Sequence, residues 1–379
     1  MKNVAAFLCL TLITAGPAWS EEIIEDNAEQ STENSTDKTT KEPTSPWIIT
    51  PLISSDPKLS TAAGGLVSYL YKFDDASPAS LFGMTGTYSN TDSFVVAGFA
   101  QIFFDEDNQR ILAALANGTV HNDYDDYLGT GIPLKTTDDI NFKVLQYSYR
   151  VYDDWFVGIQ GLSSNYKIYL AESIGQSAFD DISATVANDS LIELAGFTSN
   201  AVGLLAEYDT RDRQRSPTKG QHLKVNNSAY REALGGDISF DSYFLKYSTY
   251  FSHGNGSVLA ISSNSRWTDD APVASYSSVQ TLGYTRGQYL APHVTDIQFD
   301  ERYSLSNTWG LVAYAALACL YGETEDGTSS CIDSDNIFPS ISLGATYTIN
   351  KKEGIVVRTE IAKGKGSNRG FYMTFGHPF

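Results

Sequence analysis

The C-terminal run of the sequence constrains the fold more than any other segment. Phe371, Met373, Phe375 and Phe379 fall on one face of an alternating strand that we expect at 369–379. This strand leaves no later residues to cover its edge, and an uncovered edge is prone to pair with other chains. We therefore expect the last strand to pair with the first and so close a barrel.

The rest of the folded part also has the pattern of strands. Short aromatic and β-branched runs alternate with clusters of Asp, Asn, Gly, Ser and Pro between residues 47 and 379. Alternation is explicit at 355–361 and 243–251, although the same period also occurs in soluble sandwiches. Candidate strands lie at 64–73, 80–90, 93–104, 109–121, 140–151, 155–163, 166–172, 200–209, 220–231, 240–252, 256–267, 296–306, 309–319, 337–349, 354–363 and 369–379.

These sixteen strands occupy 333 residues (379 − 46), which leaves about 21 residues for each strand and its connection. That spacing suits strands of about ten residues joined by short turns at one end and longer loops at the other. We predict an all-β fold, a 16-stranded antiparallel transmembrane β-barrel closed between its first and last strands. An even strand number places both ends of the barrel on the periplasmic side.

The N-terminal residues predict export. Lys2 precedes an apolar run at 4–13, and small residues follow at 18–20, which is the pattern of a secretory signal peptide. Residues 21–46 hold eight acidic side chains and two lysines among Ser, Thr, Asn and Gln. We expect a signal peptide at 1–20, a disordered acidic periplasmic tail at 21–46, and an outer-membrane β-barrel at 47–379.

Charge and motif content exclude several functions. The chain has 26 basic and 45 acidic residues, so nucleic acid is not an expected partner. It contains no G-x-S-x-G, H-E-x-x-H or Walker motif, and its five histidines are far apart in sequence. Paired aspartates recur in six separate connections, which favours solvated loop carboxylates over a shared site. We expect no enzyme activity, cofactor or metal site.

One turn carries a specific motif. Asp209 and Arg211 are spaced to pair, Asp212 follows them, and Pro217 and Gly220 supply the residues that a tight turn requires. This segment resembles the turn between strands 8 and 9 in the BamA/TamA-type outer-membrane assembly and translocation barrels, also called bacterial surface antigens. The resemblance implies that the turn lies at the periplasmic rim.

The last ten residues are similar to the C-terminal signal by which such barrels are recognised for insertion. In this sequence the signal corresponds to Gly370, Phe371, Met373, Phe375 and Phe379. A final aromatic residue also ends many unrelated outer-membrane barrels, so this likeness supports location more than family.

The sixth extracellular loop of the family folds into the lumen and pairs an arginine with acids of strands 12 and 13. Arg286, Gly287 and Tyr289 resemble that motif, and strand 12 offers Asp300 and Glu301 as partners. A second register places the segment 282–284, Leu-Gly-Tyr, in the motif without an arginine.

Strand 12 has one charge on an unexpected face. If Asp300 and Arg302 face the lumen, Glu301 shares the lipid face, where a buried charge is costly and a bulge would relieve it. Strand 13 departs from the family because alanines and a leucine follow Tyr314 at 315–318, so its acid is missing.

Two cysteines are expected to form a disulfide. Cys319 and Cys331 flank the seventh extracellular loop and are the only cysteines outside the predicted signal peptide. An exported protein is oxidised in the periplasm, which favours a disulfide over two free thiols.

The family resemblance is good over residues 200–379 and weak before them, where Gly64-Gly65 fits a first strand and residues 122–129 fit a periplasmic turn. It implies insertion or movement of protein or lipid at the outer membrane, through the lumen or a weak lateral seam. The implied partners are outer-membrane lipid and a periplasmic delivery or accessory protein. The family's periplasmic repeats do not fit within residues 21–46.

Two alternative functions stay open: a passive pore or surface antigen, and a rim enzyme of the outer-membrane protease or phospholipase type. A sixth loop that plugs the lumen would favour the insertion or transport hypothesis. An open lumen would favour a pore, and a cluster of catalytic side chains at the outer rim would favour an enzyme.

Overall fold

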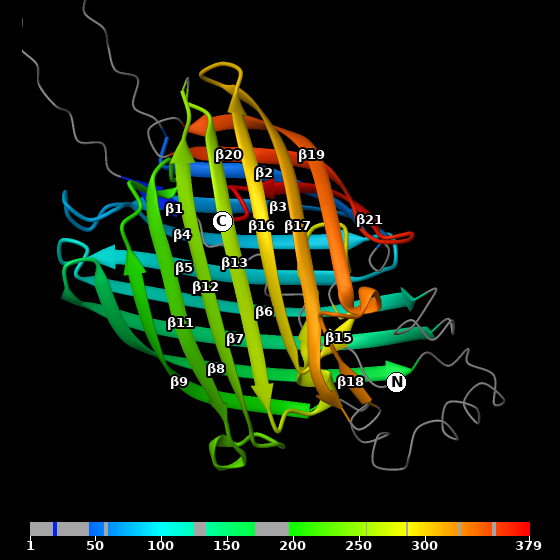
Figure 1. Cartoon of the computed structure of the whole chain (residues 1–379). Helices are drawn as coiled ribbons and strands as arrows, with labels where there is room; N and C mark the ends of the chain where they lie inside the picture. Colours follow the sequence, from blue (N-terminus) through cyan, green and yellow to red (C-terminus); the bar gives the residue numbers. More distant parts are fainter. Residues whose placement is uncertain are drawn as a thin grey trace, which may run out of the picture.

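A computed structural model describes residues 18–20, 45–56, 60–124, 134–170, 197–254, 256–285, 287–324, 327–350 and 354–379. The predicted signal peptide and acidic tail therefore lie outside the described residues, apart from residues 18–20 and 45–46. The described residues form a closed antiparallel barrel of 16 strands, as the sequence predicted (Figure 1). Among them, no helix is long and apolar enough to cross a membrane.

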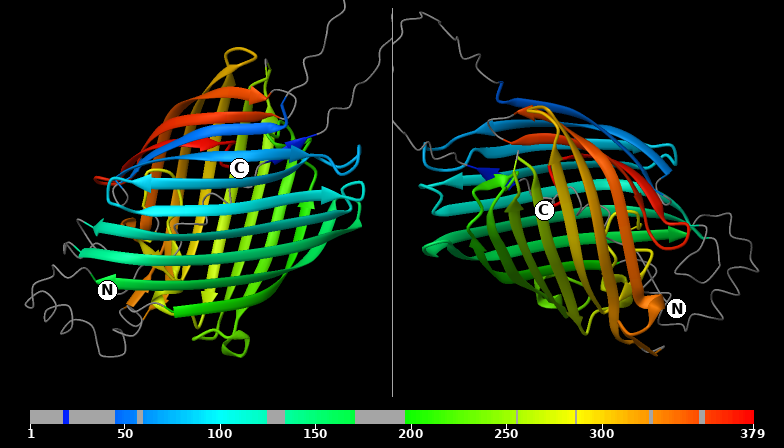
Figure 2. Two further views of the ribbon diagram at one scale, coloured as in Figure 1. Left: turned by 180° about the vertical axis from the view of Figure 1, so that it is seen from behind. Right: turned by 45° about the horizontal axis from the view of Figure 1, so that its top comes forward.

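The barrel strands follow one another around the ring in sequence order. They are Trp47–Asp56 (β2), Ser60–Tyr71 (β3), Ser80–Ser89 (β4), Phe94–Phe104 (β5), Gln109–Tyr124 (β6), Leu134–Tyr152 (β7), Trp155–Leu170 (β8), Phe197–Asp209 (β9), Gly220–Tyr230 (β11), Phe240–Ser252 (β12), Val258–Asp269 (β13), His293–Ser304 (β16), Trp309–Thr324 (β17), Ile337–Asn350 (β19), Ile355–Lys363 (β20) and Arg369–Phe375 (β21). Figure 2 shows the blue to teal strands of the first half of the chain on one side of the barrel, and much of the second half, in green to orange, on the other.

Short elements lie outside this ring. Ala18–Ser20 (β1) pairs with Arg213–Arg215 (β10), and Ser277–Ser278 (β14) pairs with Leu290–Ala291 (β15). Gly327–Ser329 (β18) pairs with the end of β17. Single 3₁₀ turns occupy Glu232–Leu234 (η2), Val273–Ser275 (η3) and Ser334–Asn336 (η4).

Antiparallel order gives the barrel two different rims. β2 begins and β21 ends at one rim, which also carries the connections 105–108, 153–154, 210–219 and 305–308; we call it the short-turn rim. β8, β11, β13 and β17 end at the other rim, and β9, β12, β16 and β19 begin there after longer connections; we call it the long-loop rim.

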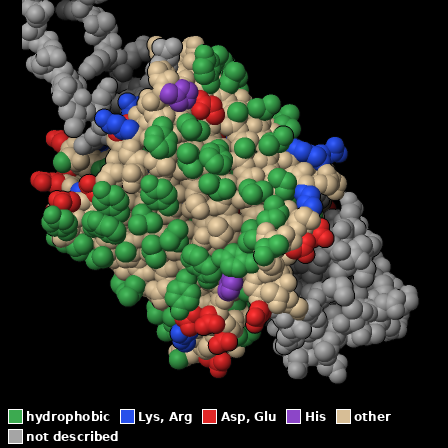
Figure 3. Space-filling model, viewed as in Figure 1, with side chains coloured by type: hydrophobic (Ala, Val, Ile, Leu, Met, Phe, Trp, Pro, Cys, Tyr) green, Lys and Arg blue, Asp and Glu red, His purple; other side chains and the backbone are tan. Residues whose placement is uncertain are grey.

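Side chains alternate between the lumen and the outer face as predicted for strand 12 of the ring, β16. Ile297, Phe299 and Tyr303 are exposed outward, whereas Asp300 and Arg302 are buried inside. The same alternation in other strands leaves an apolar belt around the barrel, which Figure 3 shows on one face with most charged side chains toward the ends. This arrangement suits a wall that faces lipid.

The expected bulge at Glu301 is absent from this described strand. β16 pairs with both neighbours in unbroken register. Glu301 instead lies near the short-turn rim, where its carboxylate contacts His253 Nε2 at 2.8 Å. A charge near the membrane boundary costs much less than one at the midplane, so no bulge is needed.

The predicted strand number was right although two of the strands were wrong. β2 was missed because Pro51 and the neighbouring serines resemble a turn, and the predicted strands 155–163 and 166–172 are the single strand β8. Proline is tolerated on an unpaired strand edge, so β2 forms despite Pro51. β7 pairs with β8 without a break at 163–165, so β8 is one strand.

These two errors cancel in number but not in orientation. Because one strand was missed at the start, every turn between that strand and the extra strand was assigned to the wrong rim of the barrel. β6 therefore ends, and β7 begins, at the long-loop rim, whereas residues 122–129 had been predicted to turn at the rim of the chain ends, the predicted periplasmic side. Residues 125–133 themselves lie outside the described residues.

The last strand is shorter than predicted. β21 ends at Phe375, and Gly376 has a φ of 86°, a left-handed conformation that turns the chain out of the ring. The C-terminal end of the chain consequently lies within the outline of the barrel (Figures 1 and 2), and Phe379 packs with Tyr250 and Tyr314. The prediction of one continuous strand over 369–379 was therefore wrong.

The ring closes through a short seam. β2 and β21 pair at two positions, Ser54 with Tyr372 and Ser55 with Phe371. Neighbouring strands elsewhere in the ring pair at seven or more positions, and β20 with β21 gives the lower limit of seven. Closure between first and last strands is therefore confirmed, and it is the weakest junction of the barrel.

Candidate functional site

Four charged side chains meet inside the barrel and form what we call the lumen cluster: Asp300, Arg302, Arg358 and Glu360. Asp300 Oδ2 accepts from Arg302 Nε at 2.8 Å, and Asp300 Oδ1 accepts from Arg358 Nη1 at 2.7 Å. Arg358 Nε then donates to Glu360 Oε1 at 2.8 Å. All four side chains are buried, so the cluster joins β16 to β20 across two intervening strands.

The strand period explains the local order of the lumen cluster. Residues two apart on a strand share a face, so Asp300 and Arg302 both point inward, as do Arg358 and Glu360. Each arginine therefore has an acid beside it on its own strand. The formal charges of the cluster cancel, as buried charges require.

Arg302 also contacts two other segments. Its Nη2 donates to the carbonyl oxygen of Phe379, and its Nη1 donates to the carbonyl of Pro217 at 3.4 Å. Pro217 belongs to the turn at 210–219, so one guanidinium binds β16, that turn and the segment after β21. Sequence reasoning did not identify this role for Arg302.

The sixth loop, 270–292, lies against the inner wall of the barrel. The hydroxyl of Tyr284 donates to the carbonyl of Pro339 at 2.5 Å and accepts from Lys365 N at 2.7 Å. Gly283 N donates to the Tyr372 hydroxyl at 3.1 Å. These contacts fix the loop to the wall through residues 282–284, the second of the two registers considered from the sequence.

Other predicted residues of the loop support its own fold. Gly287 adopts a φ of 81°, and its N–H donates to Ser278 Oγ at 2.7 Å. Tyr289 packs on Phe338, and its hydroxyl accepts from Asn368 at 3.0 Å. Gly287 therefore braces the loop internally, and Tyr289 holds it beside β19 and the residue before β21.

Arg286 lies outside the described residues, so its pairing with Asp300 or Glu301 stays a prediction. Both carboxylate oxygens of Asp300 are bound by strand arginines, and Glu301 faces outward toward His253. Arg358 thus binds Asp300 where the sequence had suggested a loop arginine. The sequence feature that could have indicated this pairing is Arg358-x-Glu360, which places an arginine and an acid on the same face of one strand.

A second set of charges, which we call the rim cluster, lies at the short-turn rim. Its described members are Asp107, Arg110, Arg150, Glu207, Asp209, Arg211 and His222. Arg110 contacts Asp107 at 2.7 Å and Asp209 at 2.9 Å, and Arg211 contacts Asp209 at 2.7 Å. A cavity of about 330 Å³ opens beside these side chains.

The turn at 210–219 positions Arg211 in the rim cluster. Asp212 accepts from Thr218 N at 2.8 Å, and Gly220 has a φ of 98° that a side chain would not favour. Although burial disfavours the Arg211 guanidinium, the charge of Asp209 outweighs it and raises the pKa of Arg211 above its ordinary value. Arg211 therefore stays charged and bound to this rim.

The rim cluster does not provide a plausible metal site. Glu207, Asp209 and His222 offer donor atoms that lie within 4.8 Å of one another. However, Arg110 and Arg211 already neutralise the two carboxylates, and His222 Nε2 contacts Glu207 at 2.8 Å. A cation would have to displace two buried guanidinium groups.

The remaining predicted site residues have clear positions. Cys319 and Cys331 form the predicted disulfide, which ties the end of β17 to the chain before η4. Gly370 is buried, while Phe371, Met373 and Phe375 are half-buried along β21. The role of these β21 residues and Phe379 in insertion stays a prediction.

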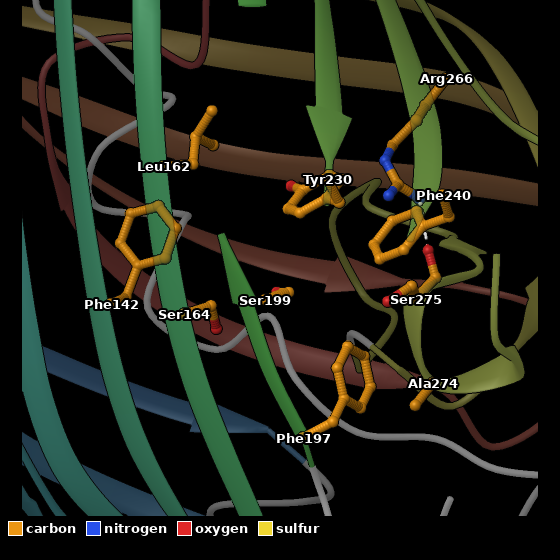
Figure 4. Close-up of a pocket in the computed structure, with 10 residues that line it drawn as sticks. All are labelled: Phe142, Leu162, Ser164, Phe197, Ser199, Tyr230, Phe240, Arg266, Ala274 and Ser275. Carbon is orange, nitrogen blue, oxygen red and sulfur yellow. Dashed lines mark hydrogen bonds between the residues drawn. The ribbon is translucent and has the colours of Figure 1, made fainter. Parts of the chain in front are cut away.

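An apolar cavity lies near the long-loop rim. Figure 4 shows Phe142 and Leu162 on one side, Tyr230 and Phe240 on the other, and Arg266 beside Ser275. The cavity measures about 30 Å³, which is room for only one or two water molecules. As it stands, it does not accommodate an organic ligand.

Comparisons with known proteins agree with this geometry. Residues 141–308 match the Omp85 superfamily domain. No curated protein sequence matches the chain significantly. Among solved structures, BamA from Haemophilus ducreyi lacking POTRA domains 1–3 has a TM-score of 0.52 and 11% identity, with 88% of this chain and 70% of that chain covered.

Two further structures share the fold. CdiB from Acinetobacter baumannii has a TM-score of 0.57 and 8% identity, with 86% of this chain and 59% of that chain covered. CdiB from Escherichia coli has a TM-score of 0.56 and 13% identity, with 89% and 63% covered. This chain therefore spans less than two thirds of either CdiB chain. With the superfamily match over residues 141–308 and the closed 16-stranded ring, the chain is similar to Omp85 superfamily β-barrels of the BamA/TamA type.

Proposed function

We propose that this barrel inserts or moves protein or lipid at the outer membrane, and that its substrate passes sideways through the β2–β21 seam. The carrying observation is the two-pair junction between these strands. A barrel normally satisfies all its main-chain groups through complete pairing, because lipid offers no replacement hydrogen bonds. A junction with two pairs is therefore the line along which the wall opens at least cost.

The orientation follows from the same topology. The short-turn rim faces the periplasm and the long-loop rim faces outward, as in a barrel whose longer loops are extracellular. The likeness to BamA and CdiB supports an outer-membrane location. The apolar belt makes outer-membrane lipid one partner, and the rim cluster faces the side from which a periplasmic delivery protein would approach.

The contents of the lumen support this proposal over a passive pore. The sixth loop is held to β19 and β21 through residues 282–284, and the segment after β21 adds Phe379 to the interior. Both arrangements place protein inside the lumen, where a porin has a wide aqueous channel.

The rim-enzyme hypothesis has less support. The described cluster of acids and histidine lies at the short-turn rim, opposite the side expected for such enzymes. Its carboxylates are bound by Arg110 and Arg211 instead of being available for chemistry.

A seam cross-link tests the proposal. Ser55→Cys with Phe371→Cys joins directly opposite residues of β2 and β21, whose Cα separation of about 5.5 Å suits a disulfide. The oxidised protein, reconstituted in liposomes, should lose its acceleration of outer-membrane protein insertion or of lipid exchange between leaflets. Reduction should restore it.

The matched control is Ala345→Cys with Thr359→Cys, an opposite pair in the β19–β20 junction, which has nine pairs. It exposes the protein to the same oxidant and reductant and should leave both rates unchanged. Full activity of the cross-linked seam would exclude the lateral route. No acceleration of either process by wild-type protein would exclude the proposed function itself.

A further inference from the structure

The seam stops before either strand ends. Its register pairs Ser55 with Phe371 and Ser54 with Tyr372. β2 nevertheless extends back to Trp47 and β21 extends forward to Phe375. Continuing the register would add three pairs, 53 with 373, 52 with 374, and 51 with 375. The lengths of the strands therefore do not explain the short seam.

The direction of each main-chain group in β2 follows from hydrogen bonds on its other side. In an antiparallel ladder, a residue directs its N–H and C=O to one neighbour, and the next residue directs them to the other. Leu70 N donates to Pro46 O at 2.9 Å, and β2 pairs with β3 from Trp47 onward without a register shift. Even-numbered residues of β2 therefore face β3, and Pro51 faces the seam.

Two other hydrogen bonds give the same result. Asn90 N donates to Thr61 O at 3.0 Å, which directs odd residues of β3 toward β4 and even ones toward β2. Gly376 N donates to Val356 O at 2.9 Å, which directs even residues of β21 toward β20. Phe375 therefore faces β2, and in the continued register it would meet Pro51.

We propose that Pro51 is the residue that stops the seam from closing further. Proline has no N–H to donate, and its ring carbon occupies the place of that hydrogen, on the side that faces Phe375. One of the two hydrogen bonds of the 51–375 pair cannot form, and the ring obstructs the approach of β21. Beyond Phe375 the turn at Gly376 removes any further partner.

The consequence concerns how the seam is regulated. Because Pro51 is part of the sequence, the number of residue pairs between β2 and β21 is limited before any partner protein or substrate binds. The seam is therefore weak in the unbound barrel. The inference deepens the proposed function and rests on it for the expected change in activity. Its structural part, the extent of pairing, is measured separately.

The test uses a cross-link placed beyond the present seam. Leu52→Cys with Thr374→Cys forms a directly opposite, non-hydrogen-bonded pair only if the register continues, with a Cα separation of about 4.5 Å. In lipid-reconstituted full chain, the additional change Pro51→Val should speed oxidation of this pair at least tenfold. An equal rate with proline and valine would overturn the proposal.

Two controls keep the result interpretable. The pair Ser55→Cys with Phe371→Cys is opposite in either case, so Pro51→Val should not change its oxidation rate. If the valine variant does not assemble, Pro51→Ala restores the N–H with a smaller side chain and carries the same expectation. Slower hydrogen exchange of residues 371–375 in either variant is an independent sign of added pairing, and unchanged exchange counts against it.

The activity assay separates this inference from the proposed function. Faster cross-linking with lower insertion or lipid exchange supports both. Faster cross-linking with unchanged activity supports the role of Pro51 and refutes the lateral route. Unchanged cross-linking refutes the role of Pro51, whatever the activity.

Discussion

The lumen cluster and the rim cluster use the same residue types in different surroundings. In the lumen cluster, the side chains of Asp300 and Arg358 are fully buried. They bind each other and the charged side chains beside them on β16 and β20. The rim cluster opens to a cavity of about 330 Å³, and the Arg150 side chain is 27% exposed. A lost partner in the lumen therefore has no substitute, whereas water can replace one at the rim.

The largest predicted effect is at Asp300. Asp300→Ala leaves Arg302 and Arg358 buried without their shared acid, and removing one partner of a buried pair costs about 3–5 kcal/mol. Urea unfolding of the detergent-solubilised barrel should show a fall of that size. A change below about 1 kcal/mol would mean that water reaches the lumen cluster.

The next effect is at the rim. Arg110→Ala removes hydrogen bonds to three carboxylates; a hydrogen bond to a charged group contributes about 1.5–3 kcal/mol net, and water entering from the cavity can hydrate the carboxylates left behind. We expect a loss in unfolding free energy below that of Asp300→Ala. The more exposed Arg150→Ala, measured in the same way, should lose less than Arg110→Ala. If Arg110→Ala costs as much as Asp300→Ala, the contrast between the clusters fails.

A third change tests which residue anchors the sixth loop. Tyr284→Phe removes the hydroxyl that bonds Pro339 O and Lys365 N, at a cost of about 1–3 kcal/mol for buried groups left unpaired. We expect higher ion conductance in planar bilayers. Arg286→Ala provides the comparison: a larger rise for that variant would favour the arginine register of the loop.

The smallest effect should come from Glu301, the neighbour of Asp300 in sequence. Glu301→Gln disrupts an exposed contact with His253, and such pairs contribute about 0–1 kcal/mol. Any measured loss should shrink further in high salt because exposed charges are screened. A loss comparable to that of Asp300→Ala would show that outward and inward faces of β16 are not as different as described.

The sequence predicted a strand correctly where its two faces differ clearly in polarity. β16 was read correctly because Ile297, Phe299 and Tyr303 alternate with charged residues. β2 was missed because Pro51 is unfavourable in a paired strand, and it is acceptable only because the unpaired part of the β2–β21 seam leaves its nitrogen at a local edge. Edge position is a tertiary property, so a local pattern did not reveal it.

The candidate site was predictable only in part, for a related reason. The turn at 210–219 and Cys319 with Cys331 depend on nearby residues and were recognised. Arg358 lies 58 residues from Asp300, and Arg110 lies 99 residues from Asp209. The sequence indicates which residues of a strand face inward. Which of these residues meet across the lumen depends on how the barrel closes.

The disulfide between Cys319 and Cys331 has a practical consequence for spectroscopy. The third cysteine of the sequence, Cys9, lies in the segment expected to be removed on export. A cysteine introduced elsewhere would then be the single reactive thiol of the mature, oxidised chain. Spin labels on a pair of cysteines introduced into β2 and β21 could therefore report the width of the junction in a native membrane by electron paramagnetic resonance, without first replacing a native cysteine.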